Sequence, residues 1–454
     1  MSKRNVILLI IILVAIVATL FGFLYFYQPK SQIGDTNEDI NFFANFLPFG
    51  GSKNTAPTTN TNQPVDVSGY QPTDANTVES PNTVVLKKIS SFPVAGFGLF
   101  MKERFKDVPV VTPPQTTDIG ATDGTRIAKP DTKFIPPPTE FAPALRYVNK
   151  ITGNIYQTFA DRIDERKFSS TTVPRVYDAY FGNKGESVVM RYLKTDNKTI
   201  ETFAGTLPKE YLGADSVGTS EVTGSFLPEN ITDISVSSDS SKIFYLFNAE
   251  NSAAGVTYSF QSNMKNQIFN SYFTEWLSTW PKSNLITITT KPSANVAGFM
   301  YSINPDNKNF NKILGDINGL TTLTSSDGKM VLYGDNNLLL NIFNTETNTS
   351  TLVGVRTLPE KCVWGGANDV VYCAVPKSVT SGQYPDSWYQ GEISFTDEIW
   401  KINVQSGNTT MISDPAIIEG GEAIDAIKLA LDESDSFLFF INKKDSYLWK
   451  LNLK

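Results

Sequence analysis

Hydrophobic and polar positions alternate over short distances through most of the chain. Runs of β-branched and aromatic residues are separated by clusters of Asp, Asn, Gly and Ser. The clearest unit spans residues 317–355, where the pattern predicts strands at 320–325, 330–333, 338–343 and 349–355. Its first turn contains Asp-Gly, a strong hairpin signal because glycine accepts the positive φ that such turns require. The pattern therefore predicts an antiparallel, all-β unit.

The four-strand pattern recurs along the chain. Aligned on the turn between their first and second strands, four successive units place Ser237, Lys282, Ser326 and Gly366 between 40 and 45 residues apart. That period is typical of the four-stranded blades of β-propellers. With two less regular units before these and one after, the sequence predicts a seven-bladed β-propeller, with six or eight blades as alternatives.

The two ends of the repeat region predict how the ring closes. The last unit supplies only three strands before the chain ends, whereas residues 83–90 form a spare strand ahead of the first unit. Pairing the two would complete the last blade and leave it no raw edge. We therefore expect the N-terminal strand to close the propeller.

Two stretches carry a resemblance to a known family. SSDGKMVLY (325–333) and EIWKINVQSGNTTMI (398–412) resemble the WD40-like repeats of TolB-type β-propellers, in which a Ser-x-Asp-Gly-Lys turn precedes a hydrophobic and aromatic strand. Only the unit with Asp327, Gly328 and Lys329 keeps the turn intact. The resemblance implies the propeller fold and, since such propellers mostly bind proteins, peptides or glycans, a binding role. No binding residue transfers by position.

The only two cysteines, Cys362 and Cys373, lie in the first two strands of one unit. With the hairpin tip at 367–368, Trp364 pairs with Val371 and Cys362 lies opposite Cys373, close enough for a disulfide. An exported domain would be oxidised. We therefore predict a disulfide within one blade, with two buried free thiols as the alternative.

The amino terminus has a different pattern. Residues 6–27 form an uncharged apolar run, long enough as a helix to cross a hydrocarbon core of about 30 Å, and Lys3 and Arg4 precede it. This order predicts a cytoplasmic stub at 1–5, a single-pass signal-anchor in the cell membrane and an extracytoplasmic remainder. A cleaved signal peptide is the alternative, although its apolar region is typically about 7–15 residues.

The segment at 28–83 is rich in Asn, Thr and Pro, a composition that cannot bury a core and predicts a flexible tether. It is interrupted at 39–51 by an aromatic segment that could lie on the membrane surface or dock against the folded domain. The propeller is then assigned to residues 84–454.

Composition excludes several classes of chemistry. The 454 residues include no histidine, which removes Ser-His-Asp and Cys-His catalysis and His-ligated zinc. A net charge of −7, with no basic run beyond the extreme N-terminus, argues against a nucleic-acid partner. Glu419, Glu422 and Asp425 could face a calcium ion but lack the regular spacing of a known loop. We expect no enzyme, no cofactor and no metal site.

The candidate functional surface is the connection at 377–396, in the same unit as the cysteines. Such a connection is normally about 2–5 residues long, and this one carries Tyr384, Trp388 and Tyr389. Exposed aromatic side chains are preferred recognition anchors, so these three are the candidate partner-binding residues. The alternative is that Trp388 folds back to cover the blade edge.

These features predict a membrane-tethered extracytoplasmic β-propeller that acts as a binding or scaffolding module for an envelope protein, peptide or glycan. The tether would keep the ring at high effective concentration near membrane-bound partners. One alternative is a carbohydrate-active propeller enzyme that uses paired carboxylates and so needs no histidine. Another is a structural subunit of an envelope assembly.

Overall fold

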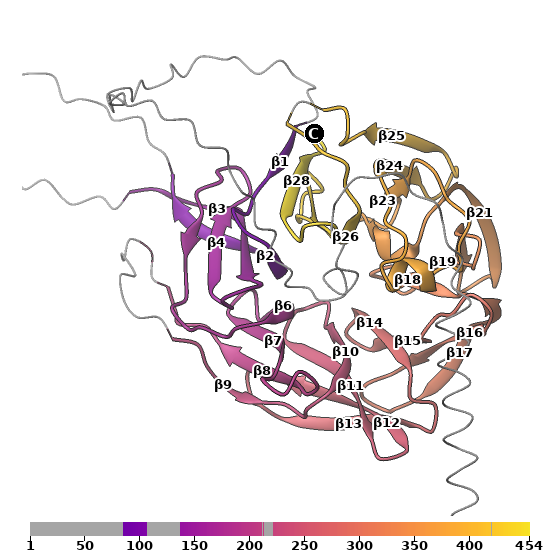
Figure 1. Cartoon of the computed structure of the whole chain (residues 1–454), viewed down its shortest axis with the longest axis horizontal. Coiled ribbons are helices and arrows are strands. Elements are labelled where there is room, and N and C mark those ends of the chain that lie inside the picture. Colours follow the sequence, from indigo (N-terminus) through magenta and orange to yellow (C-terminus); the bar gives the residue numbers. More distant parts are fainter. Residues whose placement is uncertain (1–84, 107–136, 211, 213–220, 419) are drawn as a thin grey trace, which may run out of the picture. The chain divides into compact units, whose positions relative to one another are not determined.

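The computed structural model describes residues 85–106, 137–210, 212, 221–418 and 420–454. In this part of the chain, strands β1 to β28 form seven four-stranded antiparallel sheets, which surround a common axis as the blades of a propeller (Figure 1). The predicted seven-bladed fold is confirmed. Within the described residues, none of the helices has the length and apolar composition that a membrane crossing requires.

The predicted membrane-spanning segment at 6–27 lies outside the described residues, as do the tether at 28–83 and its aromatic segment at 39–51. These assignments stay predictions.

Blades 1 to 3 each consist of four consecutive strands, ordered from the axis outwards as they follow in the chain (Figure 1). Their strands are β2 (Val94–Phe105), β3 (Thr139–Asn149), β4 (Ile155–Phe159) and β5 (Arg166–Lys167); β6 (Val176–Gly182), β7 (Ser187–Leu193), β8 (Ile200–Thr206) and β9 (Thr223–Phe226); β10 (Ile231–Val236), β11 (Lys242–Ala249), β12 (Ser252–Ser259) and β13 (Lys265–Ser271).

Blades 4 to 6 repeat this order. A short 3-10 helix directly precedes the first strand of blade 6, and a short α-helix lies between its second and third strands. Their elements are β14 (Trp276–Lys282), β15 (Leu285–Thr290), β16 (Ala297–Ile303) and β17 (Phe310–Asn318); β18 (Thr321–Thr324), β19 (Met330–Gly334), β20 (Leu339–Asn344) and β21 (Thr349–Arg356); η1 (Pro359–Lys361), β22 (Cys362–Trp364), β23 (Val370–Pro376), α2 (Asp386–Tyr389), β24 (Asp397–Asn403) and β25 (Thr409–Ser413).

Blade 7 joins the two ends of the repeat region. Strands β26 (Ala426–Leu431), β27 (Phe437–Asn442) and β28 (Leu448–Asn452) come from the end of the chain, and β1 (Leu86–Lys88) pairs with β28 as its outer strand. Leu86 lies opposite Leu451 in this antiparallel pair. The predicted closure of the ring by the N-terminal strand is therefore confirmed.

The Asp-Gly turn of blade 5 shows how local chemistry fixes each hairpin. The Ser325 hydroxyl donates a hydrogen bond to the Asp327 carboxylate (2.6 Å) and accepts one from the Met330 amide (3.0 Å). Gly328 adopts φ +76°, in the left-handed region that glycine tolerates best. The turn therefore sets the register of β18 against β19 through its own side chains.

Blade 3 keeps this turn without the glycine. Ser237 donates to Asp239 (2.6 Å) and accepts from the Lys242 amide (2.9 Å), as in blade 5. Ser240 takes the left-handed position at φ +57°. The two turns thus share the hydrogen-bonded Ser-x-Asp pair. A residue other than glycine can occupy the left-handed position, at some cost in conformational free energy.

The hydrophobic core lies between neighbouring blades. Successive residues of a strand face opposite sides of its sheet, so Val331 packs toward blade 4 with Met300, while Leu332 packs toward blade 6 with Val371. All four side chains are buried. Each blade is therefore stabilised by contacts with both neighbours.

The two cysteines form a disulfide across the first hairpin of blade 6. Cys362 pairs with Cys373 and Trp364 with Val371 in the β22–β23 register, and the two cysteine Cα atoms are 4.0 Å apart. The predicted register and the predicted disulfide are both confirmed. Closing a loop this short stabilises the fold by about 3 kcal/mol in the chain-entropy model.

Candidate functional site

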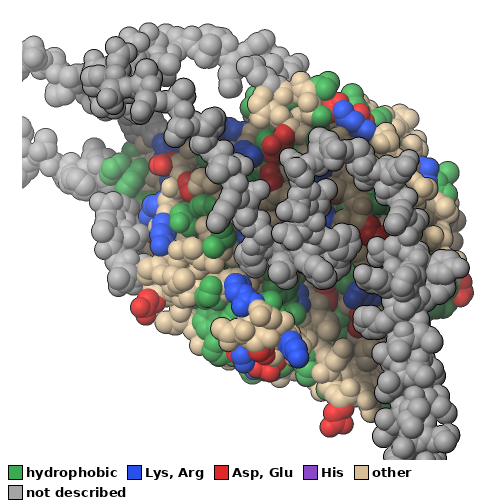
Figure 2. Space-filling model, viewed as in Figure 1, with side chains coloured by type: hydrophobic (Ala, Val, Ile, Leu, Met, Phe, Trp, Pro, Cys, Tyr) green, Lys and Arg blue, Asp and Glu red, His purple; other side chains and the backbone are tan. Residues whose placement is uncertain are grey.

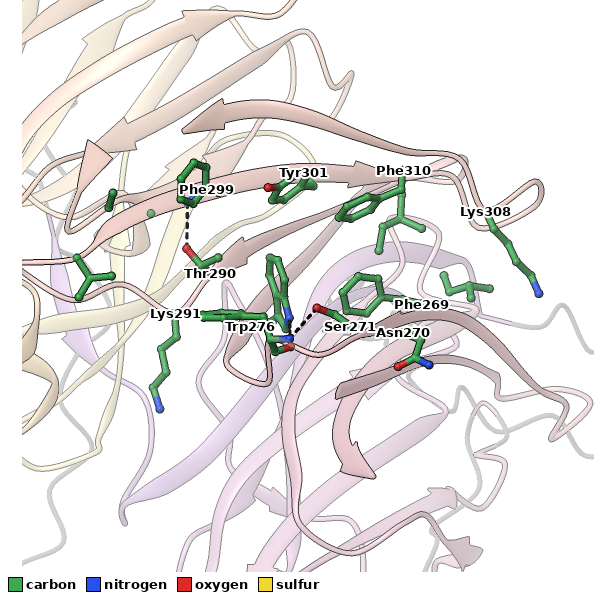
Figure 3. Close-up of a pocket in the computed structure, with 16 residues that line it drawn as sticks. Phe269, Asn270, Ser271, Trp276, Thr290, Lys291, Phe299, Tyr301, Lys308 and Phe310 are labelled. Atoms are coloured by element: carbon green, nitrogen blue, oxygen red, sulfur yellow. Dashed lines mark hydrogen bonds between the residues drawn. The ribbon is translucent and has the colours of Figure 1, made fainter. Parts of the chain in front are cut away.

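An aromatic pocket of about 590 Å³ lies at the surface where blade 3 meets blade 4 (Figure 3). Strand β13 of blade 3 forms one wall, and β16 and β17 of blade 4 form the other. The lining contains six aromatic side chains: Phe269, Phe273, Trp276, Phe299, Tyr301 and Phe310. We call this site the aromatic pocket.

The rings of the aromatic pocket hold one another in place. Tyr301 and Phe310 are stacked, with centroids 4.6 Å apart, and Trp276 meets Phe269 edge to face at 5.6 Å. The Trp276 indole donates its N–H to the Phe273 carbonyl (2.7 Å), so its only polar atom is satisfied within the protein. The pocket therefore offers preformed apolar ring surfaces.

Two rings of the aromatic pocket remain accessible to solvent. The exposed fraction is 48% for Phe273 and 46% for Phe310, whereas Trp276 is buried. Burying the exposed faces of Phe273 and Phe310 against a ligand would remove apolar area from water. This is the arrangement expected of a recognition site, in which rigid aromatic anchors surround a hollow.

Strand alternation explains why these rings face outwards. In β16, Phe299 and Tyr301 point to the pocket while Met300 between them is fully buried in the core. Phe310 starts β17, the outer edge strand of the blade, and pairs with Ile303. The repeat pattern predicted a four-stranded unit around this point of the chain but not the site; the alternation of aromatic residues around Met300 was the signal available.

Lysines flank the aromatic pocket. Figure 3 shows Lys291 and Lys308 at opposite ends of the row of rings. Lys291 forms an ion pair with Glu275 (2.9 Å), and Lys312 places its ammonium 4.8 Å from the centre of the Phe299 ring. None of the lining residues, all within the described part of the chain, carries a carboxylate or a thiol. The described lining therefore combines aromatic ring surfaces with the ammonium groups of Lys291 and Lys308.

The connection at 377–396, which we call the cap loop, places its aromatic residues differently. Tyr384 and Trp388 are buried, with exposed fractions of 3% and 4%, in a cluster with Leu358 and Phe395. Tyr389 is half-buried and donates its hydroxyl hydrogen to Glu360. The partner-binding role of Tyr384, Trp388 and Tyr389 stays a prediction; in this conformation the first two face inwards.

The Trp388 side chain is anchored by a buried ion-pair cluster. Lys361 contacts Asp397 (2.8 Å) and Asp425 (2.5 Å), and all three side chains are fully buried. The Trp388 indole donates to both carboxylate oxygens of Asp425 at 3.0 and 3.1 Å. Asp425, considered above as a calcium ligand, is thus committed to Lys361 and Trp388.

The two carboxyl groups of this cluster differ in pKa. Burial raises the pKa of Asp397 despite its contact with Lys361. Burial also acts to raise the pKa of Asp425, but the charge of Lys361 and hydrogen bonds from Lys361, the Phe395 amide and Trp388 outweigh it, so the pKa is lowered. Of the two carboxyl groups that contact Lys361, Asp425 is therefore the stronger acid.

The cap loop of blade 6 contacts connections of blades 4 and 7. The Asp386 carboxylate accepts a hydrogen bond from the Ala294 amide (2.6 Å), in the connection between β15 and β16 of blade 4. Lys443, between β27 and β28 of blade 7, donates to the Trp388 carbonyl. These contacts hold the loop against two other blades as well as its own.

A small cavity of about 210 Å³ lies beside the axis and is lined by residues of β10, β14, β15, β18 and η1. Asp233 and Glu360 both line it. Asp233 accepts hydrogen bonds from the Ser278 amide (2.7 Å) and hydroxyl (2.6 Å), and Glu360 accepts one from Tyr389. Burial raises the pKa of both carboxyl groups, and the charge of Asp233 raises that of Glu360 further.

This carboxylate pair could not be predicted from the sequence, because Asp233 and Glu360 are far apart in the chain and neither belongs to a motif. Among the described residues, no group of three or more acidic or cysteine side chains is arranged to hold a metal ion.

The surface charge on the face seen in Figure 2 is mixed. Where described residues form that face, Lys and Arg side chains are interspersed with Asp and Glu and with neutral groups.

Comparison with known proteins shows similarity of fold only. Neither a family model nor a curated protein sequence matches the chain. Similar solved structures include an oligogalacturonate lyase from Vibrio parahaemolyticus, with 9% identity and a TM-score of 0.49 over 68% of this chain and 86% of the lyase. An oligogalacturonate lyase in complex with manganese is 10% identical, with a TM-score of 0.47 over the same shares of the two chains.

TolB from Acinetobacter baumannii is also similar, with 10% identity and a TM-score of 0.37 over 67% of this chain and 61% of TolB. The chain thus matches less than two thirds of TolB. The propeller fold that the resemblance to TolB-type repeats implies is confirmed by the seven four-stranded sheets of the described residues.

Proposed function

We propose that the protein is a membrane-tethered, extracytoplasmic binding module of the cell envelope, whose propeller recognises an envelope protein, peptide or glycan. The apolar run at 6–27 supports the membrane anchor, and the disulfide between Cys362 and Cys373 is consistent with an oxidising, extracytoplasmic compartment. The aromatic pocket carries the proposal.

The dimensions of the aromatic pocket fit this role. Its volume of about 590 Å³ lies within the range of roughly 300–1,000 Å³ typical of ligand sites. Large aromatic side chains dominate the energetics of protein interfaces, and each can bury about 150–250 Å². We expect the pocket to receive a large apolar side chain of a polypeptide or the apolar face of a sugar ring.

Site-specific cross-linking tests the proposal. A photo-reactive phenylalanine analogue placed at Phe310 of the full-length chain, in its native membranes, should give discrete cross-linked adducts. Leu352 is the matched control, because it lies on β21, the outer strand of the next blade, and is 62% exposed. Adducts at position 310 but not at 352 support the pocket; identical patterns at both positions, or no adduct at 310, contradict it.

A carbohydrate-active enzyme is the second candidate, and the Asp233–Glu360 cavity is the observation that favours it. Carboxyl groups with raised pKa serve as general acids in glycoside chemistry. If the cavity is catalytic, full-length protein should cleave a polysaccharide from a screening panel, and a double variant with Asp233→Asn and Glu360→Gln should lose that activity while remaining folded. No cleavage by the wild-type chain argues against this candidate.

A structural role in an envelope assembly is distinguished by stoichiometry. A constitutive subunit should copurify with its neighbours in fixed ratio from gently solubilised membranes. A reversible binding module should instead lose its partner on dilution.

A further inference from the structure

The ion-pair cluster beneath the cap loop brings one amine and two carboxyl groups together at a fully buried position. Lys361 ends η1, Asp397 begins β24, and Asp425 directly precedes β26. The Lys361 Nζ lies 2.8 Å from Oδ2 of Asp397 and 2.5 Å from Oδ1 of Asp425. Because burial strips both partners of an ion pair of their hydration, such a pair adds little net stability. An amine in contact with two carboxyl groups also contains the reactants of an amide bond.

Asp397 has the features of the carboxyl group that an amine attacks. Its Oδ2 accepts a hydrogen bond from the Ala426 amide (2.7 Å), whereas its buried Oδ1 has no hydrogen-bond partner among the described residues. A buried polar atom without a partner is rare, because nothing compensates its lost hydration. Burial raises the pKa of Asp397, so this carboxyl retains its proton more readily, and a neutral carboxylic acid is a better electrophile than a carboxylate.

Asp425 has the features of a proton acceptor. Its Oδ2 accepts hydrogen bonds from the Trp388 indole (3.0 Å), the Ser394 hydroxyl (3.1 Å) and the Phe395 amide (3.0 Å). Hydrogen bonds of this kind favour the ionised form of a carboxyl group, which resists attack by an amine. Its Oδ1 meets the Lys361 amine at 2.5 Å and is placed to receive a proton.

The geometry of the cluster is close to that of reactants. The Asp397 oxygen that contacts Lys361 is bonded to Cγ, so Nζ lies within about 4 Å of this carbon. Reaction is strongly favoured when the reacting atoms are held about 3–3.5 Å apart. The rings of Trp388 and Phe395 lie 5.2 and 5.5 Å from Nζ and are buried, so they help to exclude water from the site.

We propose that Lys361 and Asp397 condense to an amide bond within the folded chain, with Asp425 as the proton acceptor. A C–N bond forms between Nζ and Cγ, and the bond from Cγ to Oδ1 breaks. Of the three protons of the Lys361 ammonium, one stays on the amide nitrogen, one passes to Asp425, and one joins the Oδ1 hydroxyl of Asp397, which leaves as water. The positive charge of Lys361 and the negative charge of Asp425 are both lost, so charge balances without any co-reactant.

Ala426 is placed to hydrogen-bond the product amide. Its N–H already donates to Oδ2 of Asp397, which becomes the amide oxygen, and the same N–H faces the negative charge that develops on Oδ2 during the attack. Its carbonyl oxygen already accepts a hydrogen bond from Nζ (2.9 Å). The reaction therefore replaces two buried charges and the unpaired Oδ1 by an amide whose N–H and oxygen both have partners.

The amide bond would close a covalent ring around the cap loop. Lys361 and Asp397 lie on either side of residues 377–396 in the sequence, and the disulfide from Cys362 to Cys373 lies within the same ring. Unlike the disulfide, the amide would persist in a reducing buffer. This inference goes beyond the proposed function, and it can fail without affecting the aromatic pocket.

Mass spectrometry of the purified, reduced full-length chain tests the proposal. Lys361→Arg keeps the positive charge but lacks the amine; relative to this variant, and corrected for the substitution, the wild type should be lighter by one water molecule. Trypsin should release a branched peptide with two amino termini, Thr357 and Ser378, whose fragmentation places the link between Lys361 and Asp397. A folded wild type of full mass, which trypsin cleaves after Lys361, overturns the proposal whatever the stability of any variant.

A pair of variants tests the proton acceptor. Asp425→Asn nearly keeps the shape of the side chain and should stay largely unlinked, since a positioned proton acceptor contributes about 10²–10⁴-fold to a rate. The matched control is Asp414→Asn, which breaks the ion pair with Lys377 in the same blade and should be linked like the wild type. Thermal melting establishes that both variants are folded. Full linkage of folded Asp425→Asn overturns the role of Asp425, and a branched peptide that begins at Thr357 and Ile402 overturns the assignment of Asp397.

Discussion

The aromatic pocket and the cap loop both concentrate aromatic side chains, but they use them in opposite ways. The cap loop is an insertion, yet its Trp388 points inwards to Asp425. The aromatic pocket is built on regular strands, yet Phe310 is half exposed. The difference shows that an aromatic residue on a long loop can be buried where a buried polar partner is available, and that an edge strand can leave an aromatic ring exposed.

The largest expected effect is on the ion pairs beneath the cap loop. Lys361→Met should lower the free energy of unfolding by about 3–5 kcal/mol, because it leaves Asp397 and Asp425 buried without their cation. Lys329→Met, which breaks an exposed pair with Glu346, should cost about 0–1 kcal/mol. Denaturant unfolding measures both. Equal losses would show that the buried cluster does not anchor the loop.

Replacing one aromatic residue of each region by alanine compares how much the two regions contribute to the free energy of unfolding. Trp388→Ala should cost about 3–5 kcal/mol of unfolding free energy, because it removes a buried indole and a donor to Asp425. Phe310→Ala should cost about 1 kcal/mol, since half of that ring already faces solvent. A large loss of stability from Phe310→Ala, with little from Trp388→Ala, would reverse the roles given to the two regions.

The disulfide should matter to stability and not to the aromatic pocket. Replacing Cys362 and Cys373 together by Ala should lower the free energy of unfolding by about 2–4 kcal/mol, since the unfolded chain loses its cross-link. Thermal melting with and without reductant provides the measurement. A double variant as stable as the wild type in oxidising buffer would show that the bridge contributes nothing to the fold.

The smallest expected effect is the pH dependence of stability that arises from Glu360, in the cavity beside the axis. Burial raises the pKa of Glu360, with Asp233 adding to the shift and Lys361 and Lys443 opposing it. The folded state therefore retains the Glu360 proton longer than the unfolded chain, so this group's contribution to stability falls as pH rises from about 4.3 through the folded pKa. Glu360→Gln should remove that fall.

Melting temperatures of the wild type and Glu360→Gln at pH 4 and pH 8 measure this effect. The difference, variant minus wild type, should be more positive at pH 8. A difference that is unchanged, or smaller at pH 8, would show that Glu360 ionises freely in the folded protein.

The fold could be predicted from the sequence because its determinants are local. Turn chemistry around Asp327 and Gly328 and the alternation in each strand fix the hairpins, and the same arithmetic places Cys362 opposite Cys373. Closure of the ring by β1 followed from counting strands in the last unit. These features can be predicted without knowing which residues of neighbouring blades come into contact.

The sites could not be predicted in the same way, because distant residues assemble them. The aromatic pocket combines Phe269 of blade 3 with Tyr301 and Phe310 of blade 4, and the outward face of β16 is set by core packing. Trp388 lies inwards because Asp425, in the connection from blade 6 to blade 7, supplies its partner. Sequence spacing reveals the strands but not these long-range pairings.

Hydrogen exchange distinguishes the aromatic pocket from the cap loop most directly. Amide exchange of the full-length protein would be compared before and after it is loaded with the partner captured through position 310. Binding at the aromatic pocket should slow exchange in β13, β16 and β17 and leave residues 377–396 unchanged. Slower exchange confined to 377–396 would contradict the pocket and return the binding role to Tyr384, Trp388 and Tyr389.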